Sequence, residues 1–168
     1  DEDSHFPPEL FEGMAELDWL ALAFDPEDGG ADGGAMEMAI IAEELGRASF
    51  DVAMCYIASL IAALSVYRFA TAEQRAELVP DIVSGTKRFA VSISEPDAGS
   101  DVASIRTHAA DHGDHFVVNG EKMWCTGAGL PNTLLAMYVR TDRDAPARQG
   151  ISLLIVDPTT PGVEIRRV

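Results

Sequence analysis

Two short stretches decide how this chain folds and what it can hold: Ser94-Glu95-Pro96-Asp97-Ala98-Gly99-Ser100-Asp101 and, later, Lys122-Met123-Trp124-Cys125-Thr126. The first reads as a strand that runs into a turn of Pro, Gly and Ser. The second puts a large aromatic side chain two residues from a hydroxyl. Core packing alone explains neither stretch, so both are candidates for a binding site.

The residues that precede Thr86 show helical spacing. Prolines 7 and 8 favour a helix start, and an apolar stripe then predicts a helix that ends at Asp25-Pro26. The stripe consists of Leu10, Met14, Leu17 and Ala21. A second helix is expected from Ala35 to Gly46 with Ile40, Ile41 and Leu45 inward, and a third over 51–69. Thr71-Ala72-Glu73-Gln74 is a capping box that opens a fourth helix, which Pro80 is expected to break or kink.

After Thr86 the apolar period changes to two, which is typical of strands. Strands are expected at 89–94, 134–139, 151–156 and 163–165, together with a hairpin over 116–124 whose turn is Asn119-Gly120. Helices followed by strands predict an α+β fold with segregated layers: a helical bundle over residues 1–86 and an antiparallel, barrel-like sheet over 87–168. Because the last strand has no turn after it, the sheet is expected to be truncated.

Composition excludes several classes of function. The 168 residues carry a net charge of −16, which disfavours binding to nucleic acid or to anionic membrane surfaces. The run Val52–Val66 is shorter than a membrane span and reads as a buried helix. Cys55 and Cys125 are expected to be reduced, buried thiols. No signal peptide is visible, and the missing initiator Met suggests a segment of something longer.

The turn after Ser94 has the chemistry of a ligand site. The Ser94 hydroxyl leaves the end of a strand, Gly99 permits positive φ and close approach, and Ser100 with its neighbouring amides can meet a phosphate oxygen. Trp124 and Thr126 would share one face of a strand, where an indole beside a hydroxyl suits a flat heteroaromatic ligand. Each segment taken alone is also explained as a polar loop or as a core Trp.

Taken together, these segments resemble the acyl-CoA dehydrogenase family. The resemblance runs through Arg88–Thr126, including Ala103-Ser104-Ile105-Arg106-Thr107, Asn119-Gly120 and Lys122. The helical half agrees through Ala42-Glu43-Glu44-Leu45-Gly46-Arg47 and Thr71-x-x-Gln74-Arg75. The resemblance thus covers nearly the whole chain, as an amino-terminal helical domain (1–86, without its first helix or so) and an incomplete middle β-domain (87–168).

The resemblance implies an FAD site. The residues that it assigns to FAD are Val91, Ser92, Ile93, Ser94, Gly99, Ser100, Trp124, Cys125 and Thr126. Ser94, where the family more often has Thr, would reach the pyrimidine edge of the flavin, and Thr126 would lie near N5. Gly99 and Ser100 would lie by the diphosphate, with Ser100 also beside the acyl-CoA. Cys125 receives no redox role.

The implied activity is α,β-dehydrogenation of an acyl-CoA thioester, with electrons passed to an electron-transfer flavoprotein. The family's catalytic Glu lies on a later helical domain, and no Glu in this chain matches it. The intact protein would be a homo-oligomer, a dimer of dimers, in the bacterial cytoplasm or the mitochondrial matrix. Two alternatives remain open: a short non-catalytic subunit that completes a partner's flavin site, and an acyl-CoA oxidase.

Three further patterns carry weaker signals. His108, His112 and His115 have metal-like spacing but flank the turn at 111–114, so no metal site is expected. Met36, Met38 and Met54 read as ordinary core filler. The face with Met54, Ile57 and Ile61 either borders an acyl chain, as the resemblance implies, or packs in the core.

Overall fold

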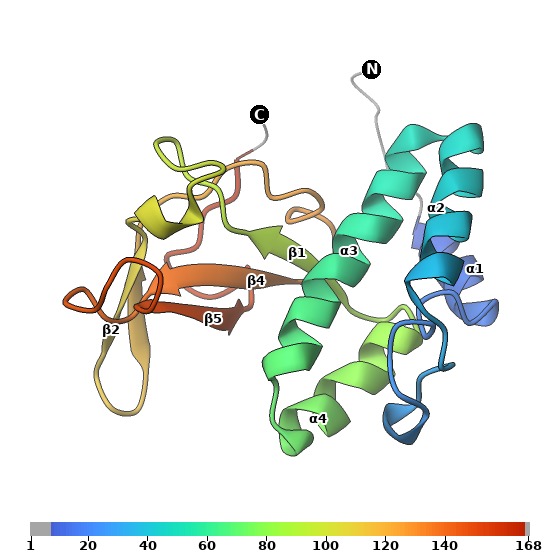
Figure 1. Cartoon of the computed structure of the whole chain (residues 1–168), viewed down its shortest axis with the longest axis horizontal. Coiled ribbons are helices and arrows are strands. Elements are labelled where there is room, and N and C mark those ends of the chain that lie inside the picture. Colours follow the sequence, from blue (N-terminus) through green and yellow to red (C-terminus); the bar gives the residue numbers. More distant parts are fainter. Residues whose placement is uncertain (1–7, 167–168) are drawn as a thin grey trace. The chain divides into compact units, whose positions relative to one another are not determined.

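The computed structural model describes residues 8–166, in two compact units. Residues 1–89 form a helical unit and residues 90–168 form a β unit. The boundary falls inside strand β1 (Arg88–Ser92), which joins the two. The chain is therefore helical first and β second, as the change of period predicts (Figure 1).

Within residues 8–89, the helical unit contains four helices and a short 3-10 turn. They are α1 (Pro8–Glu16), the 3-10 turn η1 (Pro26–Asp28), α2 (Ala35–Ala48), α3 (Phe50–Phe69) and α4 (Ala72–Val83). The predicted capping box is confirmed, because Thr71 Oγ1 accepts from the Gln74 N–H at 3.3 Å and Gln74 Oε1 accepts from the Thr71 N–H at 2.9 Å. α3 runs beside α2 (Figure 1).

The largest buried side chains of this unit come from α1, the loop after it and α3, together with Phe89 at its end. Phe11, Leu20 and Phe24 expose 2% each, and Tyr56 and Leu60 expose no more than 1%. The Tyr56 hydroxyl donates to the Trp19 carbonyl at 3.3 Å, so the core also fixes the loop that follows α1.

Several helical details differ from the sequence prediction. α1 ends at Glu16, and the residues up to Phe24 form turns, so Leu17 is 59% exposed. Pro7 lies outside the described residues. Ile40 faces solvent with 55% of its surface exposed. α4 continues past Pro80 to Val83, because the lost N–H removes a single hydrogen bond from a helix that is packed along Leu78, Val79 and Ile82.

α3 is longer than the apolar run Val52–Val66. It has 20 residues and is apolar enough to cross a membrane by length and composition, so the prediction that this segment is too short for a membrane span is wrong. Seven of its residues are buried within the unit: Ala53, Tyr56, Ser59, Leu60, Ala62, Ala63 and Val66. These side chains place one face of α3 in the core of the unit.

The β unit is a five-stranded mixed sheet. Its strands are β1 (Arg88–Ser92), β2 (His108–Asp111), β3 (Phe116–Asn119), β4 (Thr133–Arg140) and β5 (Ile151–Val156). The order is β1-β4-β2-β3, and β5 also pairs with β4. β2–β3 and β4–β5 are antiparallel, but β2 and β4 are parallel at His108 and Arg140, so the sheet is not purely antiparallel as expected. The predicted α+β class is confirmed.

The Asn119-Gly120 pair does not turn a hairpin. The hairpin joins β2 to β3 through 112–115, and Gly120 lies where the chain leaves β3. A Cβ on Gly120 would lie 2.3 Å from Thr107 Oγ1, so this glycine permits a close chain crossing. The strand expected at 163–165 is not formed either: Val163–Arg166 is irregular, and residues 167–168 lie outside the described part.

Candidate functional site

The turn after β1 is closed on itself by backbone hydrogen bonds. The Glu95 N–H donates to the Ala98 carbonyl at 2.8 Å, and the Ala98 N–H donates back at 3.1 Å. Gly99 and Ser100 follow on the surface. Gly99 does not adopt the expected positive φ, and a Cβ there would meet no atom within 4 Å. Nothing in the described protein therefore requires glycine at position 99.

This turn also exposes groups that can bind a ligand. In the described part of the chain, the N–H groups of Gly99 and Ser100 donate to no protein atom, and the hydroxyls of Ser94 and Ser100 have no partner. Successive unpaired amides beside a hydroxyl form a concavity that suits an anion such as a phosphate group.

Trp124 is the most exposed aromatic group of the β unit. It exposes 69% of its surface and has φ 60°. Residues 121–125 are irregular, so the predicted strand with Trp124 and Thr126 on one face is wrong. The Thr126 N–H instead donates to the Trp124 carbonyl at 3.0 Å, which closes a tight turn. A positive φ at a bulky residue costs on the order of 1–2 kcal/mol, and here it presents an indole to solvent.

Not every residue assigned to the site points outward. Ser92 is 1% exposed, and the half-buried Cys125 packs against a core cluster of Ala90, Ala128 and Leu135. The Cys125 side chain therefore faces the interior of the β unit, and Ser92 presents almost no surface to a ligand in this structure. The cofactor contacts predicted for both residues stay predictions. Val91, Ile93 and Ser94 are half-buried.

The segments 94–101 and 122–126 lie against each other. The Met123 N–H donates to the Ser94 carbonyl at 2.8 Å, and Lys122 Nζ donates to the Ile93 carbonyl at 3.0 Å. The backbone before the exposed turn is thus bonded directly to the backbone before Trp124. This adjacency places Ser94 and Trp124 on neighbouring segments.

Sequence reasoning missed the ion pair that accompanies this contact. Lys122 Nζ lies 2.8 Å from Glu95 Oε1, and both side chains are 7% exposed. Burial raises the pKa of Glu95, but hydrogen bonds from Lys122 and from the Thr107 and Arg106 N–H groups outweigh it and lower this pKa to about 2. Burial lowers the pKa of Lys122, and Glu95 opposes that shift. In the sequence, the signal that could have revealed this pair was a Glu and a Lys, each beside one of the two candidate ligand segments.

The remaining polar candidates do not assemble into a centre. His112 and His115 stack with ring centroids 5.2 Å apart at the hairpin turn, and within residues 8–166 no three His, Cys, Asp or Glu side chains are grouped to hold a metal. Cys55 and Cys125 are free thiols, half-buried rather than buried.

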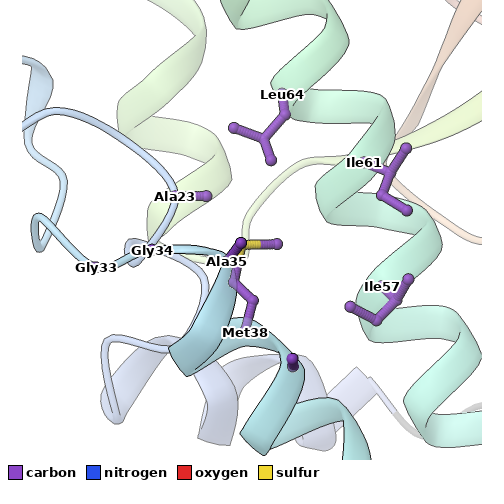
Figure 2. A pocket seen from close by; sticks show the side chains of 9 residues that line it. Ala23, Gly33, Gly34, Ala35, Met38, Ile57, Ile61 and Leu64 are labelled. Carbon is purple, nitrogen blue, oxygen red and sulfur yellow. The ribbon is translucent and has the colours of Figure 1, made fainter.

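The helical unit carries an apolar groove of its own. Its volume is about 340 Å³, and Figure 2 shows Ile57, Ile61 and Leu64 on α3 facing Met38 on α2. Ala23, Gly33, Gly34, Ala35 and Ala39 complete the lining. Ile61 is 50% exposed and Met54, earlier on α3, is 39% exposed, so core packing does not account for this face within the described residues.

Comparison with known proteins gives the same family along both units. Family models for the acyl-CoA dehydrogenase N-terminal domain and middle domain match residues 1–86 and 90–168. A probable acyl-CoA dehydrogenase of Bacillus subtilis is 35% identical over 98% of this chain, which spans 43% of that relative.

Two solved structures show the same fold. A probable acyl-CoA dehydrogenase of Mycobacterium abscessus matches with TM-score 0.89 and 32% identity, over 99% of this chain and 44% of its own. An FAD complex of PigA matches with TM-score 0.82 and 28% identity, over 93% of this chain and 41% of its own. The chain thus spans less than half of each relative, and it belongs to the acyl-CoA dehydrogenase family.

Proposed function

We propose that this chain forms the flavin-binding part of an FAD-dependent enzyme that dehydrogenates an acyl-CoA thioester between its α and β carbons. The observation that carries the proposal is the pair of adjacent, outward-facing segments. One holds an exposed indole at φ 60°, and the other holds unpaired amides and hydroxyls. Membership of the family supports it.

The exposed groups fit the parts of FAD. The Trp124 indole offers a flat face to the isoalloxazine ring, and the hydroxyls of Ser94 and Thr126 can bond its polar edges. The Gly99 and Ser100 amides suit the diphosphate, since they can hold an anion on a chain of net charge −16. When bound, FAD supplies the two-electron acceptor for the β-hydrogen of the thioester.

The groove of the helical unit fits the apolar part of the substrate. Its lining is almost wholly aliphatic, and a fatty acyl chain gains free energy from leaving water for such a surface. Ser100 is proposed to lie beside the polar CoA portion.

Glu95 does not supply the base for this reaction. Its carboxylate receives hydrogen bonds from Lys122, Arg106 and Thr107, and its pKa of about 2 makes it a weak proton acceptor. As the family resemblance implies, the proposal assigns removal of the α-proton to a Glu that is not among these 168 residues. We also propose that the intact protein is a homo-oligomer and that it passes electrons to an electron-transfer flavoprotein. Its proposed location is the bacterial cytoplasm or the mitochondrial matrix.

The visible spectrum of the protein from its natural reading frame tests this function. We expect a yellow protein whose absorbance near the flavin maximum is bleached anaerobically by one or more of a panel of acyl-CoA esters. Reoxidation should be slow in air and fast with an electron-transfer flavoprotein, whereas an oxidase would reverse that order. A purified protein without flavin that gains none when FAD is added contradicts the proposal.

A further inference from the structure

The buried pair Glu95–Lys122 connects three separate segments of the β unit. Glu95 Oε2 accepts from the Arg106 N–H at 2.6 Å, and Oε1 accepts from the Thr107 N–H at 2.9 Å. Lys122 Nζ bonds both Glu95 and the Ile93 carbonyl. The two side chains therefore tie the turn after β1 to the 105–107 segment and to the segment that leads to Trp124.

Stability alone does not explain why this position holds an ion pair rather than an apolar pair, although neutralising one partner of the existing pair is costly. Removing a carboxylate and an ammonium from water costs nearly as much as their attraction returns, and apolar side chains of similar volume often replace such pairs without loss. An apolar pair cannot accept hydrogen bonds from two particular N–H groups, and it cannot donate a hydrogen bond to a particular carbonyl. The bonds observed here specify the relative register of backbone segments.

The location of the pair indicates that this register serves the two exposed segments. Glu95 follows Ser94, and Lys122 lies two residues before Trp124, so each partner borders one of the exposed segments. Each exposed turn has backbone hydrogen bonds of its own, from Glu95 to Ala98 and from Thr126 to Trp124. The two turns are joined to each other by the Met123 N–H bond to the Ser94 carbonyl and by the bonds of Lys122.

We propose that Glu95 and Lys122 are positioning residues that hold the Ser94–Ser100 turn and the Trp124–Thr126 turn in a fixed relation, so that the ligand surface exists before the ligand arrives. The inference rests on the proposed flavin site for its purpose, but the rigidity that it assigns to Trp124 belongs to the protein alone. Preorganisation of this kind raises affinity by removing the cost of ordering on binding.

The test uses Trp124 as its own reporter. The chain has two tryptophans, so Trp19→Phe leaves Trp124 alone. In that background, Lys122→Met keeps the length of the side chain without its charge, and Lys122→Arg restores a cation. Lys87→Met is the matched control, because Lys87 Nζ pairs with Asp81 at 2.7 Å on the surface of the helical unit. Time-resolved Trp anisotropy and FAD affinity are measured at a temperature where circular dichroism shows each variant folded.

We expect Lys122→Met to add a fast component to the Trp124 anisotropy decay and to weaken FAD binding about tenfold, the change that corresponds to one lost hydrogen bond of ordinary strength. Lys122→Arg should recover part of both, and Lys87→Met should change neither. If Lys122→Met does not fold, Glu95→Gln, which keeps volume and one acceptor, replaces it.

The outcomes separate this inference from the proposed function. A folded Lys122→Met with parental anisotropy and parental FAD affinity overturns the positioning role. So does a result in which neither Lys122→Met nor Glu95→Gln folds, since the pair would then be a determinant of folding. If the parental chain binds no FAD, the flavin site fails, while the anisotropy still decides whether the pair fixes Trp124.

Discussion

Glu95 and Lys122 expose 7% of their side chains, whereas Trp124, two residues beyond Lys122, exposes 69% of its surface. Glu95 and Lys122 form hydrogen bonds with other groups of the protein. The exposed turns at 94–100 and 124–126 contain hydroxyls, amides and an indole without partners in the described structure. This contrast between neighbours indicates that the buried pair, which we call the support, holds the exposed turns, which we call the ligand surface. Changes in the support should therefore alter stability, and changes in the surface should alter binding.

The largest effect on stability is expected from Gly120→Ala. The new Cβ would lie 2.3 Å from Thr107 Oγ1 and 2.6 Å from Thr107 Cα, and backbone cannot move aside cheaply. We expect a loss of about 3 kcal/mol in the free energy of unfolding, measured with urea. Gly113→Ala is the control, because its φ is +93° but its Cβ meets open space. It should cost about 1 kcal/mol. If both variants lost the same free energy of unfolding, the backbone at Gly120 would not lie close against Thr107.

Acid should weaken the support through Glu95. Its pKa is about 2 in the folded chain, below the ordinary value of 4.5, so the folded state binds fewer protons than the unfolded state between these values. The stabilisation is complete above pH 4.5 and is lost as the pH falls toward 2. It amounts to up to about 3 kcal/mol. Urea unfolding at several pH values should show a steeper fall for the parent than for Glu95→Gln. Identical slopes would remove Glu95 from the support.

Trp124→Gly should separate binding from stability. Glycine removes the strain of φ 60° but adds freedom to the unfolded chain, and each term is about 1 kcal/mol, so the free energy of unfolding should change by less than that. FAD affinity should fall at least about tenfold, because the aromatic face is lost. Leu135→Ala in the core is the counterpart, with an expected loss of about 3 kcal/mol. A large destabilisation by Trp124→Gly would mean that the indole packs on protein.

The smallest effect is expected from Gly99→Ala. A Cβ at this position meets no protein atom, and φ does not require glycine, so stability should stay within about 0.5 kcal/mol. If a diphosphate lies against this backbone, the added methyl group should still weaken FAD binding several-fold. Calorimetric titration measures it. Unchanged affinity would place the diphosphate elsewhere.

Much of this contrast could be predicted from sequence, because its parts are local. The change of period near Thr86 locates the transition from helices to strands, and the capping box and β5 are read from neighbouring residues. What failed depends on contacts between distant segments. Asn119-Gly120 has the composition of a hairpin turn, yet Gly120 is needed for its contact with Thr107. Ile40 has an apolar side chain that the described structure leaves exposed.

The candidate site divides in the same way. Residue types at 94–100 and 124–126 indicated a ligand from sequence alone. The structure was needed to show the positive φ of Trp124, the burial of Ser92, the inward side chain of Cys125 and the Glu95–Lys122 pair. Alternation along an assumed strand could not show that residues 121–125 are irregular.

The central claim is that the two exposed turns form one flavin-binding surface. Its most direct test is a ¹⁵N–¹H NMR spectrum of the labelled chain as FAD is added. The account predicts that the amide signals of Gly99, Ser100, Trp124 and Thr126 shift together and saturate at one FAD concentration, while signals from Ile57 and Ile61 in the groove do not move. Shifts confined to the groove, or no shifts at all, would contradict it.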